Sequence, residues 1–133
     1  MSVLSDPLAD MLTRVRNSLK AGHLRVDMPS SKLKISVARI FKNEGFIKNY
    51  KILDDKRQKV LRIYLKYGND RQPAIYDLER ISRPGRRVYK KAEELKPIMN
   101  NIGIWILSTS KGVITNKAAK KLNVGGEILC KIS

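Results

Sequence analysis

The sequence has 133 residues and carries 28 Lys and Arg residues against 12 Asp and Glu residues, which gives a formal net charge of +16. This length is enough for one domain or for two small lobes. Because 42% of the residues are hydrophobic, the chain can form a core, and a disordered basic tail is excluded. Both halves have an excess of basic residues, so we expect a large polyanion as partner, either a nucleic acid or an anionic membrane surface.

Several other classes of protein are disfavoured by the sequence. The longest apolar run, Ile102 to Leu107, is far shorter than the roughly 20 residues that a membrane-spanning helix needs. Acidic Asp6 and Asp10 near the N-terminus, without an apolar segment, argue against a secretory signal. The single cysteine, Cys130, cannot form an internal disulfide, and with the single histidine, His23, it cannot build a structural zinc site of the usual kind. We therefore expect no metal, no cofactor and no small-molecule substrate.

The first predicted helix begins at Pro7, because Ser5 or Asp6 can cap a helix and proline suits its first position. Its apolar residues recur at helical spacing, namely Leu8, Met11, Leu12, Val15 and Leu19. Gly22 is predicted to end this helix. The segment Leu24 to Met28 then alternates like a short strand, which Pro29 ends.

A second amphipathic helix is predicted between a Ser30-Ser31 N-cap and Gly45. Its apolar stripe consists of Leu33, Val37, Ile40 and Phe41, and its basic residues are Lys32, Lys34, Arg39 and Lys42. Two strands, Phe46 to Leu53 and Val60 to Tyr67, follow and are joined by a turn at residues 54–56. We assign residues 1–68 to an N-terminal α/β lobe with two helices on a short sheet, and residues 69–77 to a connection.

Residues 78–133 are predicted to form a C-terminal lobe that is mostly β, with short helices. The elements expected around and within it are an extended segment Ile75–Ser82, a turn Arg83-Pro84-Gly85, a strand Arg86–Tyr89, a brief helix within Lys91–Asn100, a strand Ile102–Thr109, a short helix capped by Thr115 that contains Ala118, Ala119 and Leu122, and a last strand Glu127–Ile132. The predicted fold class is therefore α+β, with two small lobes.

The first candidate site is the stretch Arg80 to Lys91, which holds six basic residues and no acidic one. Basic side chains such as Arg86 and Arg87 neutralise phosphates, and the ring of Tyr89 can stack on a base or a sugar. The alternative is a solvated basic turn in which Tyr89 covers the core.

The second candidate is Ser108-Thr109-Ser110-Lys111-Gly112, where three hydroxyl residues leave an apolar strand before a Lys-Gly turn. Short hydroxyls can contact sugars, phosphates or base edges, and Gly112 allows backbone to approach backbone. The alternative is a polar loop whose hydroxyls bond to their own backbone. Ser108 and Lys111 also form a Ser-x-x-Lys pattern of acyl-serine enzymes, but the companion motifs are absent, so we expect no catalytic residue and no enzymatic activity.

The third candidate is Gly125-Gly126-Glu127. Two glycines allow close approach of this segment to its neighbours. Glu127 either braces the Ser108–Gly112 segment by accepting hydrogen bonds or is an ordinary exposed carboxylate. Elsewhere, Cys130 and Trp105 are expected to pack in the core.

Six short stretches of the chain, taken in order, form a recognisable pattern. They are Asp6–Asn17, Met28–Lys32, Glu44–Ile47, Ile81–Gly85 followed by Tyr89, Ser108–Thr115 and Gly125–Cys130. In this order, and over nearly the whole chain, they resemble the family of small-subunit ribosomal protein eight, bacterial type. Each stretch alone is weak, whereas the complete series is very specific.

The resemblance implies that the protein is a structural constituent of the small ribosomal subunit. It also implies that the protein binds the central domain of small-subunit rRNA directly and helps to assemble the platform, at an irregular helical region that exposes base edges. Neighbouring small-subunit ribosomal proteins are implied as further partners, and a membrane is not. The implied location is the ribosome of the cytoplasm, with an organelle-encoded ribosome left open.

Carried over residue by residue, the resemblance implies an RNA-binding surface made mainly by the second lobe. Its predicted members are Ser108, Thr109, Ser110, Lys111, Gly112, Tyr89, Arg86 and Arg87, with Gly125, Gly126 and Glu127 bracing the loop, and with Ser31, Lys32, Arg14 and Asn17 added by the first lobe. Distributed basic residues, Lys34 among them, are expected to supply affinity for the backbone, while the Ser108–Gly112 segment selects the RNA shape. A non-specific basic nucleic-acid-binding protein is the alternative.

Overall fold

The computed structural model describes residues 6–95 and 103–133 and divides the chain into two compact units. One unit is Leu8–Tyr76, and the other consists of Asp77–Ser133 together with the residues before Leu8. The boundary between residues 76 and 77 falls inside the predicted connection. The predicted first lobe differs from the structure at its N-terminus, because Asp6 belongs to the C-terminal unit, where it pairs with Arg80.

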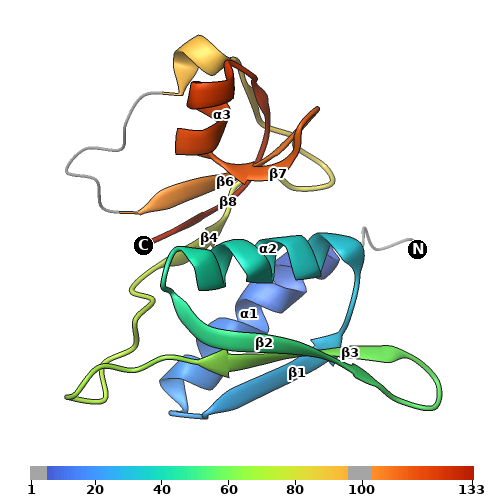
Figure 1. The fold of residues 1–133 in the computed structure, drawn as a ribbon, viewed down its shortest axis with the longest axis vertical. Helices are drawn as coiled ribbons and strands as arrows, with labels where there is room; N and C mark the ends of the chain where they lie inside the picture. Colours follow the sequence, from blue (N-terminus) through green and yellow to red (C-terminus); the bar gives the residue numbers. More distant parts are fainter. Residues whose placement is uncertain (1–5, 96–102) are drawn as a thin grey trace. The chain divides into compact units, whose positions relative to one another are not determined.

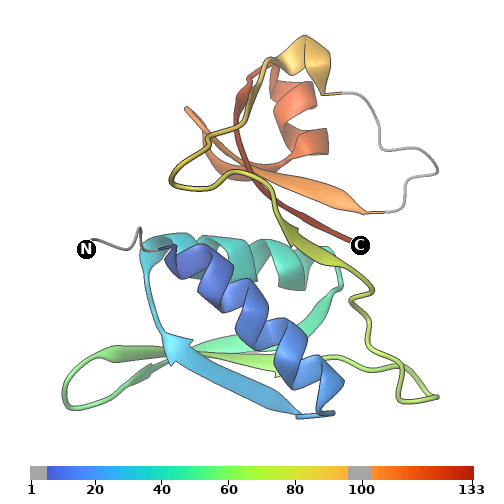
Figure 2. The same ribbon diagram turned by 180° about the vertical axis from the view of Figure 1, so that it is seen from behind.

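The N-terminal unit is a three-stranded antiparallel sheet with two helices on one of its faces (Figures 1 and 2). Its elements are α1 (Pro7–Lys20), β1 (Arg25–Pro29), α2 (Lys32–Asn43), β2 (Ile47–Asp54) and β3 (Lys59–Leu65). The central strand is β3, which pairs with β1 on one side and with β2 on the other. The predicted two helices on a short sheet are therefore confirmed.

Both helices of this unit form where the sequence pattern predicts them. The apolar stripe of α1 is buried as expected, and the side chain of Ser31 caps α2 by accepting a hydrogen bond from the backbone N–H of Lys34 at 3.2 Å. The prediction for Leu33 was wrong, because this side chain is exposed. The buried residues of α2 include Lys34 and Ala38, which the predicted stripe did not contain. The buried face is therefore rotated around the helix by about one residue from the predicted one.

The C-terminal unit is built on a five-stranded antiparallel sheet in the order β4-β8-β6-β7, with β5 also paired to β8. Its elements are β4 (Leu78–Arg80), β5 (Tyr89–Lys90), the 3-10 turn η1 (Ala92–Glu94), β6 (Ile104–Thr109), β7 (Gly112–Thr115), α3 (Asn116–Leu122) and β8 (Gly126–Ile132). A core of Leu95, Leu107, Ala119 and Ile128 lies between one face of the sheet and the short helices. The α+β class is therefore confirmed, with a mostly β second unit.

Four elements of the C-terminal unit differ from the sequence prediction. The predicted strand Arg86–Tyr89 is shifted, because β5 consists of Tyr89 and Lys90 alone. The strand β7 was missed, because four residues are too short to show an alternating pattern. The predicted helix within Lys91–Asn100 is a single 3-10 turn over residues 92–94, and its part from residue 96 onward lies outside the described residues. The extended segment Ile75–Ser82 contributes only the three residues of β4 to the sheet.

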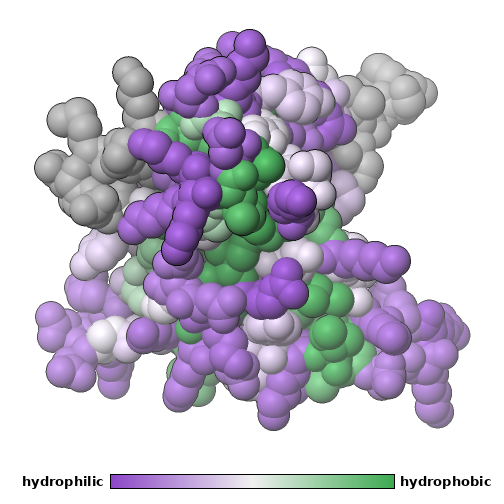
Figure 3. All heavy atoms as spheres, turned by 45° about the horizontal axis from the view of Figure 1, so that its top comes forward, coloured by the Kyte–Doolittle hydropathy of each residue, from purple (hydrophilic) through white to green (hydrophobic). Residues whose placement is uncertain are grey.

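Cys130 and Trp105 both pack in the core as predicted, although Trp105 is only partly buried. Cys130 is fully buried, which raises the pKa of its thiol to about 12, and Trp105 packs against the core cluster. Hydrophilic residues cover most of the face drawn in Figure 3, as the net charge of +16 leads one to expect. No helix in the described part of the chain is long and apolar enough to cross a membrane.

Candidate nucleic-acid interface

The main sequence candidate forms a tight hairpin rather than a loop. Ser108 and Thr109 end β6, Gly112 begins β7, and Ser110 and Lys111 make the two-residue turn between them. Gly112 has a φ of 101°, a backbone conformation that glycine adopts without strain. The turn therefore presents Ser110 and Lys111 at an exposed tip.

The hydroxyl of Thr109 shapes this turn. It accepts a hydrogen bond from the backbone N–H of Lys111 at 3.0 Å and donates one to the carbonyl oxygen of Gly112 at 2.9 Å. For Thr109, the alternative of side-chain-to-backbone bonding is therefore the one observed. The two hydrogen bonds of Thr109 therefore fix the backbone of the turn from which the side chains of Ser110 and Lys111 extend.

Three candidates from distant parts of the sequence lie in one row across the sheet. Glu127 of β8 is opposite Ser108 of β6 on one side and opposite Tyr89 of β5 on the other. Directly opposed residues in antiparallel strands point to the same face, so these side chains share a surface. Tyr89 is 67% exposed, which rules out the alternative that its ring covers the core.

Gly125 and Gly126 hold β8 close to the segments on both sides of it. A Cβ atom at position 126 would collide with the carbonyl oxygen of Ser108 and lie 2.9 Å from Cγ2 of Thr109. A Cβ atom at position 125 would collide with the carbonyl oxygen of Lys90. The predicted close approach at these glycines is confirmed, and it sets the spacing between the hairpin, β8 and β5.

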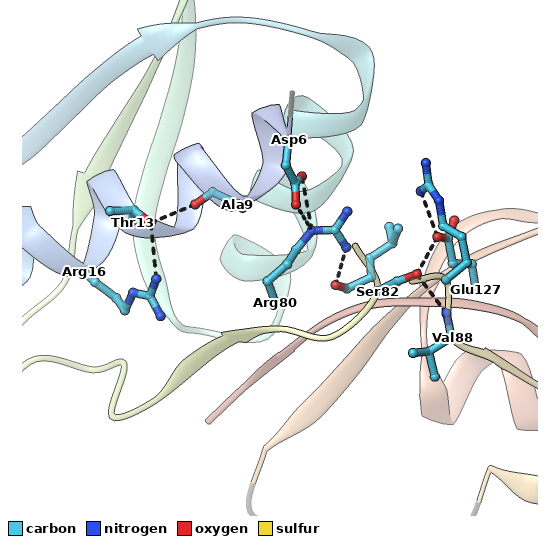
Figure 4. Close-up of polar contacts among 10 residues, drawn as sticks. Asp6, Ala9, Thr13, Arg16, Arg80, Ser82, Val88 and Glu127 are labelled. Carbon is cyan, nitrogen blue, oxygen red and sulfur yellow. Dashed lines mark hydrogen bonds and ion pairs between the residues drawn. The ribbon is translucent and has the colours of Figure 1, made fainter. Parts of the chain in front are cut away.

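Glu127 braces a different segment from the predicted one. Its Oε2 atom accepts hydrogen bonds from Oγ of Ser82 at 2.6 Å and from an Nη atom of Arg87 at 3.0 Å (Figure 4). The buried hydroxyl of Ser82 accepts a further hydrogen bond from the backbone N–H of Val88 at 3.0 Å. These bonds fasten residues 82–88 to β8. Glu127 is opposite Ser108 in register, but its carboxylate bonds to Ser82 and Arg87 and not to the Ser108–Gly112 segment.

The charge of Glu127 is part of this arrangement. Burial alone would raise the pKa of its carboxyl group, but hydrogen bonds from Ser82 and Arg87 and the nearby positive charges lower the pKa below its ordinary value of 4.5. The same pairing raises the pKa of Arg87. The carboxylate therefore stays ionised at neutral pH and holds one arginine of the basic stretch against the sheet.

Two residues of this unit have structural roles that the sequence analysis missed. The guanidinium group of Arg80 lies 3.1 Å from the carboxylate of Asp6 and donates a hydrogen bond to the carbonyl oxygen of Leu129 at 2.6 Å (Figure 4). Its side chain is only 10% exposed, so Arg80 is a structural member of the basic stretch. The one sequence signal for Ser82 is its place directly before the turn that begins at Arg83.

The remaining predicted residues lie on the helices of the N-terminal unit. Ser31 and Lys32 are at the start of α2, and Arg14 and Asn17 are exposed on α1. The guanidinium group of Arg14 pairs with the carboxylate of Asp10 at 3.0 Å, one helical turn away. Such an exposed pair contributes little to stability, so Arg14 keeps its freedom to bind elsewhere.

Lys34 is not the surface cation that the sequence analysis expected. It is 5% exposed, and its ammonium group donates a hydrogen bond to the carbonyl oxygen of Pro29 at 2.9 Å. Burial lowers the pKa of Lys34, against the charge of Asp10, which raises it. Lys34 therefore ties α2 to the end of β1 and is removed from the set of expected phosphate contacts.

A rigid sheet surface with an exposed aromatic ring, hydroxyl groups and many cations is typical of RNA-binding proteins. The family model described as Ribosomal protein S8 matches residues 6–133. The chain is 53% identical to "Small ribosomal subunit protein uS8" of Geotalea uraniireducens over 129 residues, which are 97% of this chain and 98% of the relative. It is 52% identical to the protein of the same name from Koribacter versatilis over 132 residues, 99% of each chain. The chain therefore belongs to the ribosomal protein S8 family, and the resemblance found in the sequence is confirmed.

Proposed function

We propose that this protein is a structural constituent of the small ribosomal subunit and that its C-terminal unit binds the central domain of the rRNA. Its relatives are named as small ribosomal subunit proteins and match it over nearly their whole length. The observation that carries the proposal is the row Tyr89–Glu127–Ser108 beside the exposed tip of the β6–β7 hairpin. Neighbouring small-subunit ribosomal proteins are the other partners that this role requires.

In this proposal, affinity and selection come from different groups. Lys111, Arg83 and Arg86 are exposed and neutralise phosphates without regard to sequence. Tyr89 offers a ring for stacking, and Ser110 offers a hydroxyl group that reaches base edges or sugars at close range. Because backbone contacts and hydrogen bonds hold these groups at a set spacing, only RNA of a matching shape satisfies all of them together.

We propose binding without catalysis. A Ser-x-x-Lys pair lies on one face when it is helical, but here Ser108 belongs to a strand and Lys111 to the turn that follows it. No cluster of three or more metal-binding side chains is present among residues 6–95 and 103–133. Stable labelling of Ser108 by an acyl-serine probe would contradict this part of the proposal.

The test is a filter-binding titration with a central-domain rRNA fragment, in the presence of random duplex RNA and at several salt concentrations. Tyr89→Leu is expected to weaken binding by about 1–3 kcal/mol, the range for loss of stacking on one base. Tyr76→Leu is the matched control, because Tyr76 is an even more exposed tyrosine, 85% against 67%, in the other unit. Ser110→Ala is expected to cost about 1–3 kcal/mol if it leaves a buried RNA group unpaired.

Two results would count against the proposal. If random duplex competes as well as the fragment and salt abolishes binding, the protein is a non-specific basic nucleic-acid binder. If Tyr89→Leu and Tyr76→Leu reduce affinity equally, the C-terminal row does not select the RNA.

A further inference from the structure

The N-terminal sheet has a second surface whose residues the proposed function does not use. The helices α1 and α2 lie on one face of the sheet, where Leu61, Ile63 and Leu65 of β3 are buried (Figures 1 and 2). Alternate residues of each strand point to the opposite face. Two adjacent rows of that opposite face, read across β1, β3 and β2, are Arg25–Tyr64–Asn49 and Asp27–Arg62–Lys51.

One arginine of this face is bonded to a residue of the neighbouring strand. Arg62 of β3 pairs with Asp27 of β1 through two hydrogen bonds, Nε to Oδ1 at 2.8 Å and an Nη atom to Oδ2 at 3.0 Å. A two-bond arginine–carboxylate pair has a defined geometry. The centre of the face is therefore ordered, although it is open to solvent.

An aromatic ring and two cations surround this ordered centre. Tyr64 is half-buried in the middle of its row, between exposed Arg25 and half-buried Asn49. The ammonium group of Lys51 lies 5.7 Å from the centre of the Tyr64 ring. The two rows together carry three basic side chains against one acidic side chain and no aliphatic one.

We propose that this face binds an unpaired segment of RNA, with a base on the ring of Tyr64 and phosphates against Arg25 and Lys51. Cations beside an aromatic ring on an open sheet match the chemistry of single-stranded nucleic acid. Stacking of a base on the ring is stronger than an exposed cation–π contact, so a base can displace the ammonium group of Lys51 toward a phosphate. A regular duplex does not offer a free base face, so an unpaired segment fits the ring of Tyr64 better.

This inference goes beyond the proposed function, because it concerns the other unit and an RNA of another form. Its test is the binding of a labelled, uridine-rich, unpaired oligonucleotide to the full chain, followed by fluorescence anisotropy. The double variant Arg25→Gln/Lys51→Gln is compared with Arg57→Gln/Lys56→Gln, whose residues are exposed in the turn between β2 and β3. Both variants remove one Arg and one Lys, so they change the net charge equally.

The sheet-face variant is expected to bind the oligonucleotide about tenfold more weakly at low salt. The slope of log K against log salt concentration is expected to decrease by about 1.4, because two phosphate contacts of a single strand are lost. The control variant is expected to remain within about twofold of the wild type. Equal losses in both variants, or no loss in either, would overturn the inference.

Further measurements complement the comparison of the variants, and the first of them does not depend on the stability of the double variant. With the wild-type chain, an oligonucleotide that contains 4-thiouridine is expected to crosslink to the peptide of residues 63–66, and crosslinks only elsewhere would overturn the inference. Affinity for the central-domain fragment, bound through the C-terminal unit, is expected to stay unchanged in the sheet-face variant. If the wild type shows no preference for that fragment but the oligonucleotide results hold, the proposed function fails and this inference stands. Tighter binding of the same face to phosphatidylserine vesicles than to RNA would also overturn it.

Discussion

The two units hold their exposed polar side chains in different ways. In the C-terminal unit, Ser108 and Tyr89 stand on two strands that both pair with β8, and Gly125 and Gly126 allow the close approach of these strands to β8. In the N-terminal unit, residues such as Arg14 extend from a helix surface, and the pair with Asp10 is local and exposed. A fixed spacing suits the selection of an RNA shape, whereas flexible cations suit attraction to phosphates of any sequence.

The difference shows that net charge alone does not assign roles to basic residues. Arg80 and Lys34 both belong to basic stretches of the sequence, yet Arg80 is half-buried, Lys34 is buried, and both are bonded within their own units. Lys111 and Lys32 are exposed. Substitutions that change either the spacing of the strands or the charge of one side chain therefore test this difference between the two units.

The largest effect is expected from Gly126→Ala. Its Cβ atom would collide with the carbonyl oxygen of Ser108, so β6 and β8 must move apart, and we expect a loss of about 3 kcal/mol in the free energy of unfolding. Gly68→Ala is the control, because its Cβ atom would lie 3.8 Å from the carbonyl oxygen of Gln72, and we expect less than about 0.5 kcal/mol. Urea denaturation measures both. Equal stability of the two variants would remove Gly126 as the residue that sets the spacing.

A smaller effect is expected from the titration of Glu127. Because the folded state lowers the pKa of this group, its stabilisation is present above its ordinary pKa of 4.5 and is lost as pH falls through the folded-state pKa. The stability advantage of the wild type over Glu127→Gln is therefore expected to shrink as the pH is lowered from neutral to below 4.5. Urea unfolding of both proteins across this range measures the difference. Parallel stability curves would show that the charge of Glu127 does not brace residues 82–88.

The smallest effect separates two lysines at the start of α2. Lys32→Ala is expected to reduce the slope of log K against log salt concentration for rRNA binding by about 0.7–0.9, the value for one phosphate contact. Lys34→Met is expected to leave this slope unchanged, because its ammonium group already bonds to Pro29 inside the unit. Filter binding at several salt concentrations measures both slopes. A reduced slope in the Lys34 variant would restore Lys34 to the RNA surface and weaken the contrast between the two units.

The features that sequence reasoning predicted correctly depend on local patterns. The stripes of both long helices, the cap at Ser31 and the two strands of the β2–β3 hairpin follow from spacing along a few residues. Where the pattern was weak, the prediction failed, as at Leu33 and at the short strand β7. In α2, Leu33 is exposed and the neighbouring Lys34 is buried. Tertiary packing decides this arrangement, and a hydrophobic pattern in the sequence cannot predict it.

By itself, the sequence determined the fold class, the family, the basic character of the protein and the segments from which the candidate surface is made. Only the tertiary structure decided which of these segments touch. The hydrogen bond from Ser82 to Glu127 joins residues 45 positions apart, and the contact of Gly126 with Ser108 depends on the register between β6 and β8. Register is set by packing and pairing over the whole sheet, and a shift of one residue turns every side chain to the other face. For this reason the sequence indicated candidate members of the surface, while the hydrogen-bond partners of Glu127 and the burial of Lys34 emerged only from the fold.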